Sequence, residues 1–167
     1  MKRIGLSITL IIYTILAVFI TICLLAYNEY NVTEIGKYSL VKAEKDFNNY
    51  QKGSLLLIDN TKVNKVKKGD YLFFYNAYET EKDVILKRVK AIEEVNKKEK
   101  TFIFEDDSYI SSEYAIGTTK NTKAIGFIGT ILLVLESKAG YLCLVILPLL
   151  VLFIYEIYSI IQEIKRK

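Results

Sequence analysis

The chain contains no histidine. Without imidazole, Ser-His-Asp and Cys-His catalysis are excluded, as are zinc and non-haem iron sites that depend on histidine ligands. Only two cysteines are present, Cys23 and Cys143, and each lies inside an apolar run near opposite ends of the chain. A disulfide framework or a thiolate metal site is therefore not expected, and both thiols are interpreted as small packing groups. We expect neither a metal nor a cofactor.

A strong excess of one charge is also missing. The net charge is +4, and the lysines alternate with Asp and Glu instead of forming a basic stripe, so nucleic-acid binding is not indicated. Hydrophobic residues make up 51% of the 167 residues, yet 25% are charged. This combination favours segregation, with the apolar residues in membrane segments and the charged residues in one water-facing domain.

The first long apolar run covers residues 4–27, after a basic start at residues 1–3. About 20 apolar residues are needed to cross a bilayer as a helix, so we expect a first transmembrane helix here. The alternative is a cleaved signal peptide, whose apolar core would be about 7–15 residues followed by a small-x-small site. The length of this run favours the membrane anchor.

A second apolar run predicts a transmembrane helix over residues 139–161, followed by a basic tail at residues 162–167. Pro148 lies inside it, and proline is tolerated in membrane helices, where it can introduce a kink. Glu156 lies near the end of the run, where a carboxylate can reach the interface; the alternative is a buried functional carboxylate.

The basic flanks predict the orientation. Lys2 and Arg3 precede the first run, and residues 165–167 follow the second, which favours cytoplasmic locations for both termini. A multi-pass protein of the cell membrane with two spans then has its central domain, residues 28–138, on the extracytoplasmic side.

Within that domain the apolar pattern is that of strands. A continuous apolar run at 55–58, an aromatic run at 71–75 and partly alternating residues at 84–92 and 101–104 each predict a strand, and residues 125–135 predict another. The expected fold is therefore mainly β, a small β-barrel or sandwich flanked by two transmembrane helices.

The part of the domain before these strands is less distinct. Residues 42–47 contain helix-forming side chains and predict a short connecting helix. Asn31 begins an Asn-x-Thr sequon, which so close to a membrane run is interpreted as accidental.

Four motifs in order suggest a family. They are a Gly-containing strand entry at 52–58, a Gly-Asp strand at 68–74, a Lys-Arg-Val strand at 85–89 and an acidic, Ser-containing loop at 105–113. Between two membrane runs, this order and spacing resembles the type I signal peptidases, membrane-tethered serine proteases that use a Ser-Lys dyad to cut signal peptides from exported preproteins. The resemblance extends from residue 4 to about residue 161.

The resemblance assigns roles to several residues. Lys87 stands in the position of the general base, and aliphatic neighbours are the surroundings that disfavour an ammonium ion. The alternative is a surface lysine on an edge strand. Asp106, Ser111 and Glu113 match the loop that supports the family's catalytic site.

The nucleophile does not match. Counting back eight residues from Gly53, where the resemblance places the catalytic serine, reaches Lys45, and the family's auxiliary serine falls on Ala43. Ser39 is an alternative nucleophile that requires an insertion, and Ser54 would be misplaced. If Lys45 stands opposite Lys87, two ammonium groups face one site and no acyl acceptor is present.

The sequence therefore favours a signal-peptidase-like membrane protein that has kept the scaffold and lost catalysis. It would bind signal peptides or secreted and surface proteins, and would have a secretion or surface-assembly partner. Two alternatives remain. One is an active signal peptidase with Ser39 as a displaced nucleophile, and the other is a two-span scaffold that binds a protein partner.

Overall fold

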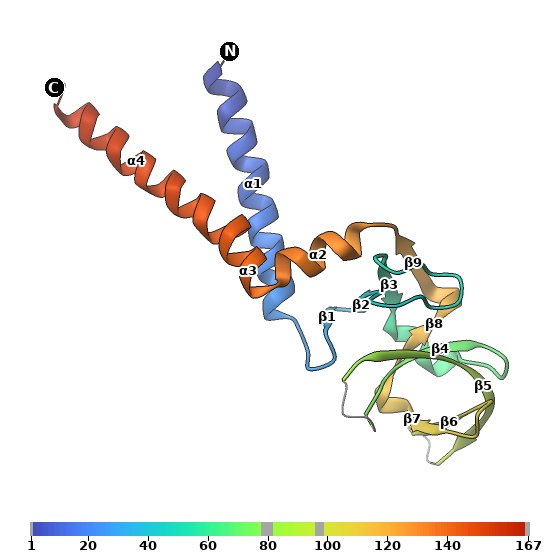
Figure 1. Cartoon of the computed structure of the whole chain (residues 1–167). Helices are drawn as coiled ribbons and strands as arrows, with labels where there is room; N and C mark the ends of the chain where they lie inside the picture. Colours follow the sequence, from blue (N-terminus) through green and yellow to red (C-terminus); the bar gives the residue numbers. More distant parts are fainter. Residues whose placement is uncertain (1, 78–81, 96–98, 166–167) are drawn as a thin grey trace. The chain divides into compact units, whose positions relative to one another are not determined.

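The computed structural model describes residues 2–77, 82–95 and 99–165 (Figure 1). The chain divides into two compact units, a helical unit formed by Met1–Ile22 with Ile131–Lys167 and a β unit formed by Cys23–Thr130. Each unit is described by itself below.

The helices follow the two apolar runs of the sequence, except α2, which lies between the β unit and the second run. Their bounds are α1 (Lys2–Leu25), α2 (Ile128–Glu136), α3 (Lys138–Tyr141), the π-helical turn η4 (Leu142–Ile146) and α4 (Leu147–Lys165). The stretch Lys138–Gln162 is 25 residues of helix, long and apolar enough to cross a membrane, as expected for the second span. In α1 the apolar helix with described side chains is Leu10–Leu25, which is shorter, so the first span stays a prediction.

Pro148 lies in the first turn of α4 and the helix continues through it. Because proline has no N–H, the carbonyl of Leu144 loses its usual partner four residues on. The hydroxyl of Tyr13 on α1 points to this place, 2.8 Å from the Leu144 carbonyl oxygen and 3.0 Å from that of Val145. A tyrosine on one helix therefore satisfies a carbonyl that proline frees on another, as an apolar surrounding requires.

The β unit contains two antiparallel sheets, which confirms the mainly β prediction. The first has the order β1-β2-β3-β9 and the second the order β7-β6-β5-β4-β8. Their bounds are β1 (Val32–Ile35), β2 (Tyr38–Lys42), β3 (Leu55–Asp59), β4 (Tyr71–Tyr75), β5 (Val84–Glu94), β6 (Lys100–Phe104), β7 (Tyr109–Ser111), β8 (Ala115–Thr118) and β9 (Thr122–Ile125). Single 3-10 turns are η1 (Asn60–Lys65), η2 (Ser112–Tyr114) and η3 (Thr119–Asn121).

Strand β4 is buried on both faces and supplies two hydrophobic cores. Phe73 belongs to the first core, with Val41, Leu56 and Val84 among its members. Its neighbour Phe74 belongs to the second core. The second core also contains Leu72, Val89, Phe102, Phe104 and Ile110. Because successive side chains of a strand point to opposite faces, one strand separates the two cores.

Two local predictions are wrong. The segment 125–135 is not a strand, because β9 ends at Ile125 and α2 begins at Ile128. Phe127 has a left-handed backbone (φ 60°) that ends the strand, and short apolar runs do not distinguish helix from strand.

The segment 42–47 is not a helix, because its backbone hydrogen bonds go to another segment: the Ala43 N–H donates to the Ser54 carbonyl at 2.9 Å, and the Ala43 carbonyl accepts from the Gly53 N–H at 2.7 Å.

Candidate functional site

Lys87 lies on β5, directly opposite Leu72 of β4. Alternation along the strand places it on the same face as Ile85 and Val89, which pack in the second core. Val84 and Leu86 face the first core. The aliphatic neighbours of Lys87 in the sequence are thus divided between the two faces of β5. The side chain of Lys87 lies on the face that packs against the second core.

The ammonium of Lys87 is held by the turn after β6. Its Nζ donates to Asp106 Oδ2 at 2.6 Å and to Ser108 Oγ at 2.9 Å, and it lies 5.8 Å from the centre of the Phe104 ring. The Ser108 hydroxyl in turn donates to Asp106 Oδ1 at 2.5 Å. These three residues form a closed set of hydrogen bonds, which we call the Lys87 triad.

The hydrogen bonds of the triad have a defined direction. Hydrogen bonds from Lys87 and then from Ser108 lower the pKa of Asp106 to about 2, so its carboxylate is charged near neutral pH. Both hydrogen bonds of the Lys87 Nζ are donated, one to Asp106 and one to Ser108. Ser108 also gives its proton to Asp106 and not to Lys87. The arrangement stabilises the turn after β6.

Replacing Lys87 with methionine is expected to raise the pKa of Asp106 toward its ordinary value of 3.8. The pair is half-exposed, 31% on the lysine side and 53% on the aspartate side, so its loss lowers the free energy of unfolding by no more than about 1 kcal/mol at pH 7. Because the folded-state pKa is depressed, this stability is present above about pH 4 and is lost as the pH falls toward 2. Carbon-13 NMR titration of the Asp106 carboxyl measures the shift directly.

Lys90→Met is the matched control for that prediction. Lys90 pairs with Asp107 at 2.5 Å in the same turn, and both side chains are exposed. Its removal is expected to leave the titration of Asp106 in place. A native Asp106 that titrates near 3.8 would contradict the triad.

A cavity of about 340 Å³ opens beside the triad. Aromatic, aliphatic and polar side chains line it: Phe74, Asn76, Ile85, Lys87, Phe104, Asp107, Ser108 and Tyr109. Lys87 is thus at the wall of a cavity, as a site residue would be, but its charge is already matched by Asp106.

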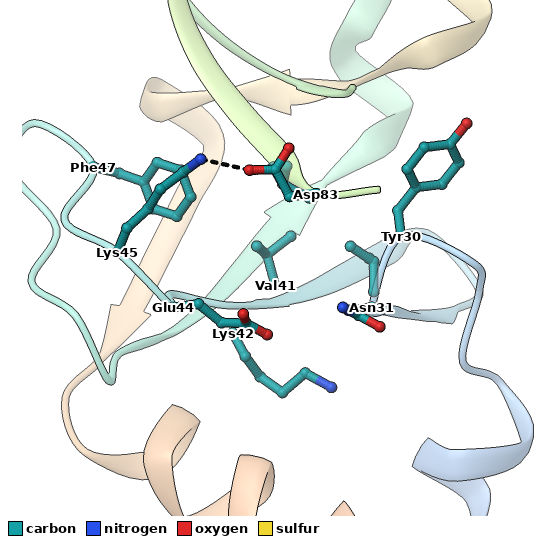
Figure 2. A pocket seen from close by; sticks show the side chains of 10 residues that line it. Tyr30, Asn31, Val41, Lys42, Glu44, Lys45, Phe47 and Asp83 are labelled. Atoms are coloured by element: carbon teal, nitrogen blue, oxygen red, sulfur yellow. Dashed lines mark hydrogen bonds and ion pairs between the residues drawn. The ribbon is translucent and has the colours of Figure 1, made fainter. Parts of the chain in front are cut away.

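Lys45 lines a different cavity, of about 270 Å³, which we call the β1–β5 cavity (Figure 2). Its Nζ donates to Asp83 Oδ2 at 2.5 Å, just before β5 begins, and lies 6.0 Å from the centre of the Phe47 ring. The remaining lining residues are Tyr30, Asn31, Val32, Val41, Lys42, Glu44 and Val84. An ion pair therefore joins the loop after β2 to the start of β5 across this cavity.

The structure does not bring Lys45 and Lys87 together. They line separate cavities and pair with separate carboxylates, and β5 contributes Val84 to one cavity and Ile85 to the other. The expectation of two ammonium groups facing one site is not met, because the side chain of β5 that follows Val84 on the first-core face is Leu86.

Neither alternative serine meets Lys87. Ser39 is buried in the first sheet, opposite Ile58 of β3 and Glu34 of β1, and its hydroxyl hydrogen-bonds to the Tyr75 hydroxyl. Burial, above all, raises the pKa of Tyr75, with the Glu34 carboxylate adding to it. Ser54 is buried at the entry to β3. Ser39 thus has a structural place within a sheet.

Of the three loop residues suggested by the resemblance, Asp106 contacts Lys87. Ser111 Oγ accepts weakly from the Glu113 N–H at 3.5 Å and so begins the turn η2. Ser108 lies within the acidic, Ser-containing loop at 105–113 but was not matched to Lys87, and Asp83, two residues before the Lys-Arg-Val strand, was not considered. Only the pairing of the strands reveals these two contacts. No group of three or more potential metal ligands occurs in the part of the chain that the structure describes.

One edge of β5 is open beside the β1–β5 cavity. Over Val84–Arg88 the strand pairs with β4, whereas β6 pairs only from Val89 onward. The bonds of Val89 to Asp70 and Gly69 point toward β4, so alternation directs the N–H and C=O of Val84 and Leu86 to the other side. Among the described residues no strand pairs with that side. By contrast, the outer edge of β1 is covered by the Tyr27–Thr33 bridge.

No protein-family model matches the chain, and a search of curated proteins found no match.

Proposed function

We propose that this chain is a signal-peptidase-like integral membrane protein that binds exported preproteins in extended form and does not cleave them. Two membrane spans, with both termini in the cytoplasm, hold the β unit on the extracytoplasmic side. The proposal takes the order of the sequence motifs as its starting point. The geometry of the β1–β5 cavity and of the neighbouring strand edge supports its binding part.

The observation that carries the proposal is the open edge of β5 next to that cavity. A peptide added there gains main-chain hydrogen bonds from Val84 and Leu86, and its alternate side chains reach the cavity. At about 270 Å³ the cavity is below the ~300 Å³ typical of small-molecule sites, which favours one or two peptide side chains. Lys45, Glu44 and Asp83 supply charges at the rim.

Loss of catalysis is supported by what lines the cavity. Lys45 stands where the resemblance expects the nucleophile, and no serine is among the described residues of the lining. Lys87 lies against the other cavity and is bound to Asp106. Binding without cleavage needs neither a nucleophile nor a free base.

Strand addition predicts an alternating response when single amides of a bound peptide are N-methylated. The ligand is a synthetic peptide with the small-x-small cleavage region of an exported preprotein, and affinity for the full chain in lipid nanodiscs is measured by fluorescence anisotropy. Methylation at every second residue is expected to weaken binding about 2- to 10-fold, because each removes one main-chain hydrogen bond. The residues between them are internal controls, and a uniform response would exclude strand addition.

Cleavage assays test the catalytic half of the proposal. An exported preprotein incubated with the full chain in nanodiscs is expected to remain intact. The alternative, an active signal peptidase, is favoured by one observation, the 2.9 Å contact between Lys87 Nζ and Ser108 Oγ. Cleavage that is lost in Lys87→Ala and in either Ser39→Ala or Ser108→Ala would establish that alternative and identify the nucleophile.

A further inference from the structure

Six consecutive residues at the end of the β unit, Lys123 to Ile128, are all exposed. Three of them are large and apolar: Ile125, Phe127 and Ile128. We call these three the β9–α2 patch. Ile125 ends β9, an edge strand of its sheet, and Ile128 begins α2, so the patch covers the connection between these two elements. Figure 1 shows the chain passing from β9 into α2.

Phe127 is the most unusual residue of the patch. The residue is 83% exposed, and its backbone has a φ of 60°, the left-handed region that bulky side chains rarely adopt. Backbone strain of this kind persists where it serves a placement. Here the strained residue carries an exposed aromatic side chain. Its exposure has a cost in free energy unless a second apolar phase covers it.

The helix that follows has no water-facing stripe. In α2 every residue except Gly129, Thr130 and Glu136 is aliphatic. Ile131, about one helical turn on from Ile128, and Val134, about one turn on from Ile131, are exposed as well. A surface helix in water carries polar residues on its outer face, and a helix without them is covered by protein or lipid.

The position of α2 in the sequence favours lipid over protein as the cover of this helix. Only Ser137 separates α2 from Lys138, where the membrane-spanning stretch begins. Nine helical residues extend about 14 Å, so the connection keeps Phe127 within about 20 Å of the start of that stretch. Exposed lysines, Lys123 and Lys138, stand at the two ends of the segment, as basic residues do beside lipid headgroups.

We propose that the β9–α2 patch is a membrane-interface anchor, which inserts Phe127 and the exposed side of α2 into the headgroup region of the bilayer that holds Lys138–Gln162. The partner is lipid, with anionic headgroups at the lysines. This anchor holds the entry to the β unit at the membrane surface. It rests on membrane attachment and is independent of whether the β1–β5 cavity binds a peptide.

The chain contains no tryptophan, so a single introduced indole reports alone. The test uses Phe127→Trp in the full chain, reconstituted in vesicles of phosphatidylcholine and phosphatidylglycerol. Its fluorescence emission is expected to be blue-shifted relative to an indole in water. Quenching is expected from lipids brominated near the glycerol end of the acyl chain and to be weaker from lipids brominated near the methyl end.

Two further variants serve as controls. Tyr109→Trp replaces another exposed aromatic of the β unit, 65% exposed on β7, and is expected to emit as in water without quenching. Phe153→Trp lies within the membrane-spanning stretch and is expected to be quenched most by deep bromines. Quenching of Phe153→Trp without quenching of Phe127→Trp would overturn the anchor. A blue shift of Phe127→Trp without quenching would overturn it too, by showing a protein cover.

Discussion

Replacing Phe73 with alanine is expected to lower the free energy of unfolding of the β unit by about 3–5 kcal/mol. The side chain is fully buried at the centre of the first core. Its ring lies edge-on to Phe47 at 5.7 Å between centroids and 5.9 Å from that of Tyr50. Since small domains are stable by only about 5–15 kcal/mol, this one cavity removes a large share of the total.

The measurement is amide hydrogen exchange along β4 in the full chain, compared with Tyr71→Ala. Tyr71 is on the same strand but partly exposed, with its ring 6.0 Å from the Arg88 guanidinium. Its truncation is expected to cost about 1 kcal/mol or less. Equal acceleration of exchange in the two variants would show that Phe73 is not central to the core. Phe73→Leu, which keeps most of the volume, separates loss of packing from failure to fold.

The same strand shows which parts of the fold the sequence predicts. The apolar runs that became β3, β4, β5 and β6 were predicted because their residues are buried, and hydrophobic pattern is the signal that sequence reasoning uses. Strands β1 and β2 were missed because polar residues, Thr33 and Ser39, are buried in them. Gly36, with a φ of 59° between these strands, is the turn signal from which that hairpin could have been found.

The sequence predicts single residues that line the two cavities, Lys45 and Lys87, but not the groups that they contact. Lys87 and Asp106 both follow from the order of motifs, but their contact depends on the register of β5 with β6. That register shifts between Val89 and Ala91, where a bulge adds one residue to β5. A pattern of single residues does not specify such a bulge, so the sequence could not show that Lys87 turns toward Asp106 and away from Lys45.

The loop that carries Lys45 is held by a chain of backbone contacts that ends at Gly129. Ala43, at the start of the loop, exchanges hydrogen bonds with Gly53 and Ser54, and the Thr130 N–H donates to the Gly53 carbonyl at 3.0 Å. Gly129 packs directly on this turn. A Cβ at Gly129 would lie 2.4 Å from the Ser54 carbonyl oxygen and 2.7 Å from that of Gly53.

Gly129→Ala is therefore expected to lower the free energy of unfolding of the β unit by about 1–3 kcal/mol, since backbone atoms must move to admit the methyl group. The displaced turn also shifts Ala43 and the loop wall of the β1–β5 cavity, so peptide affinity should fall with stability.

Gly126→Ala is the matched control: it lies three residues earlier with nothing within 4 Å of the added Cβ, and its effect on the free energy of unfolding should stay within about 0.5 kcal/mol. Urea unfolding and peptide anisotropy on both variants measure the two effects. If Gly129→Ala loses stability while peptide affinity is unchanged, the loop wall of the β1–β5 cavity does not depend on this turn.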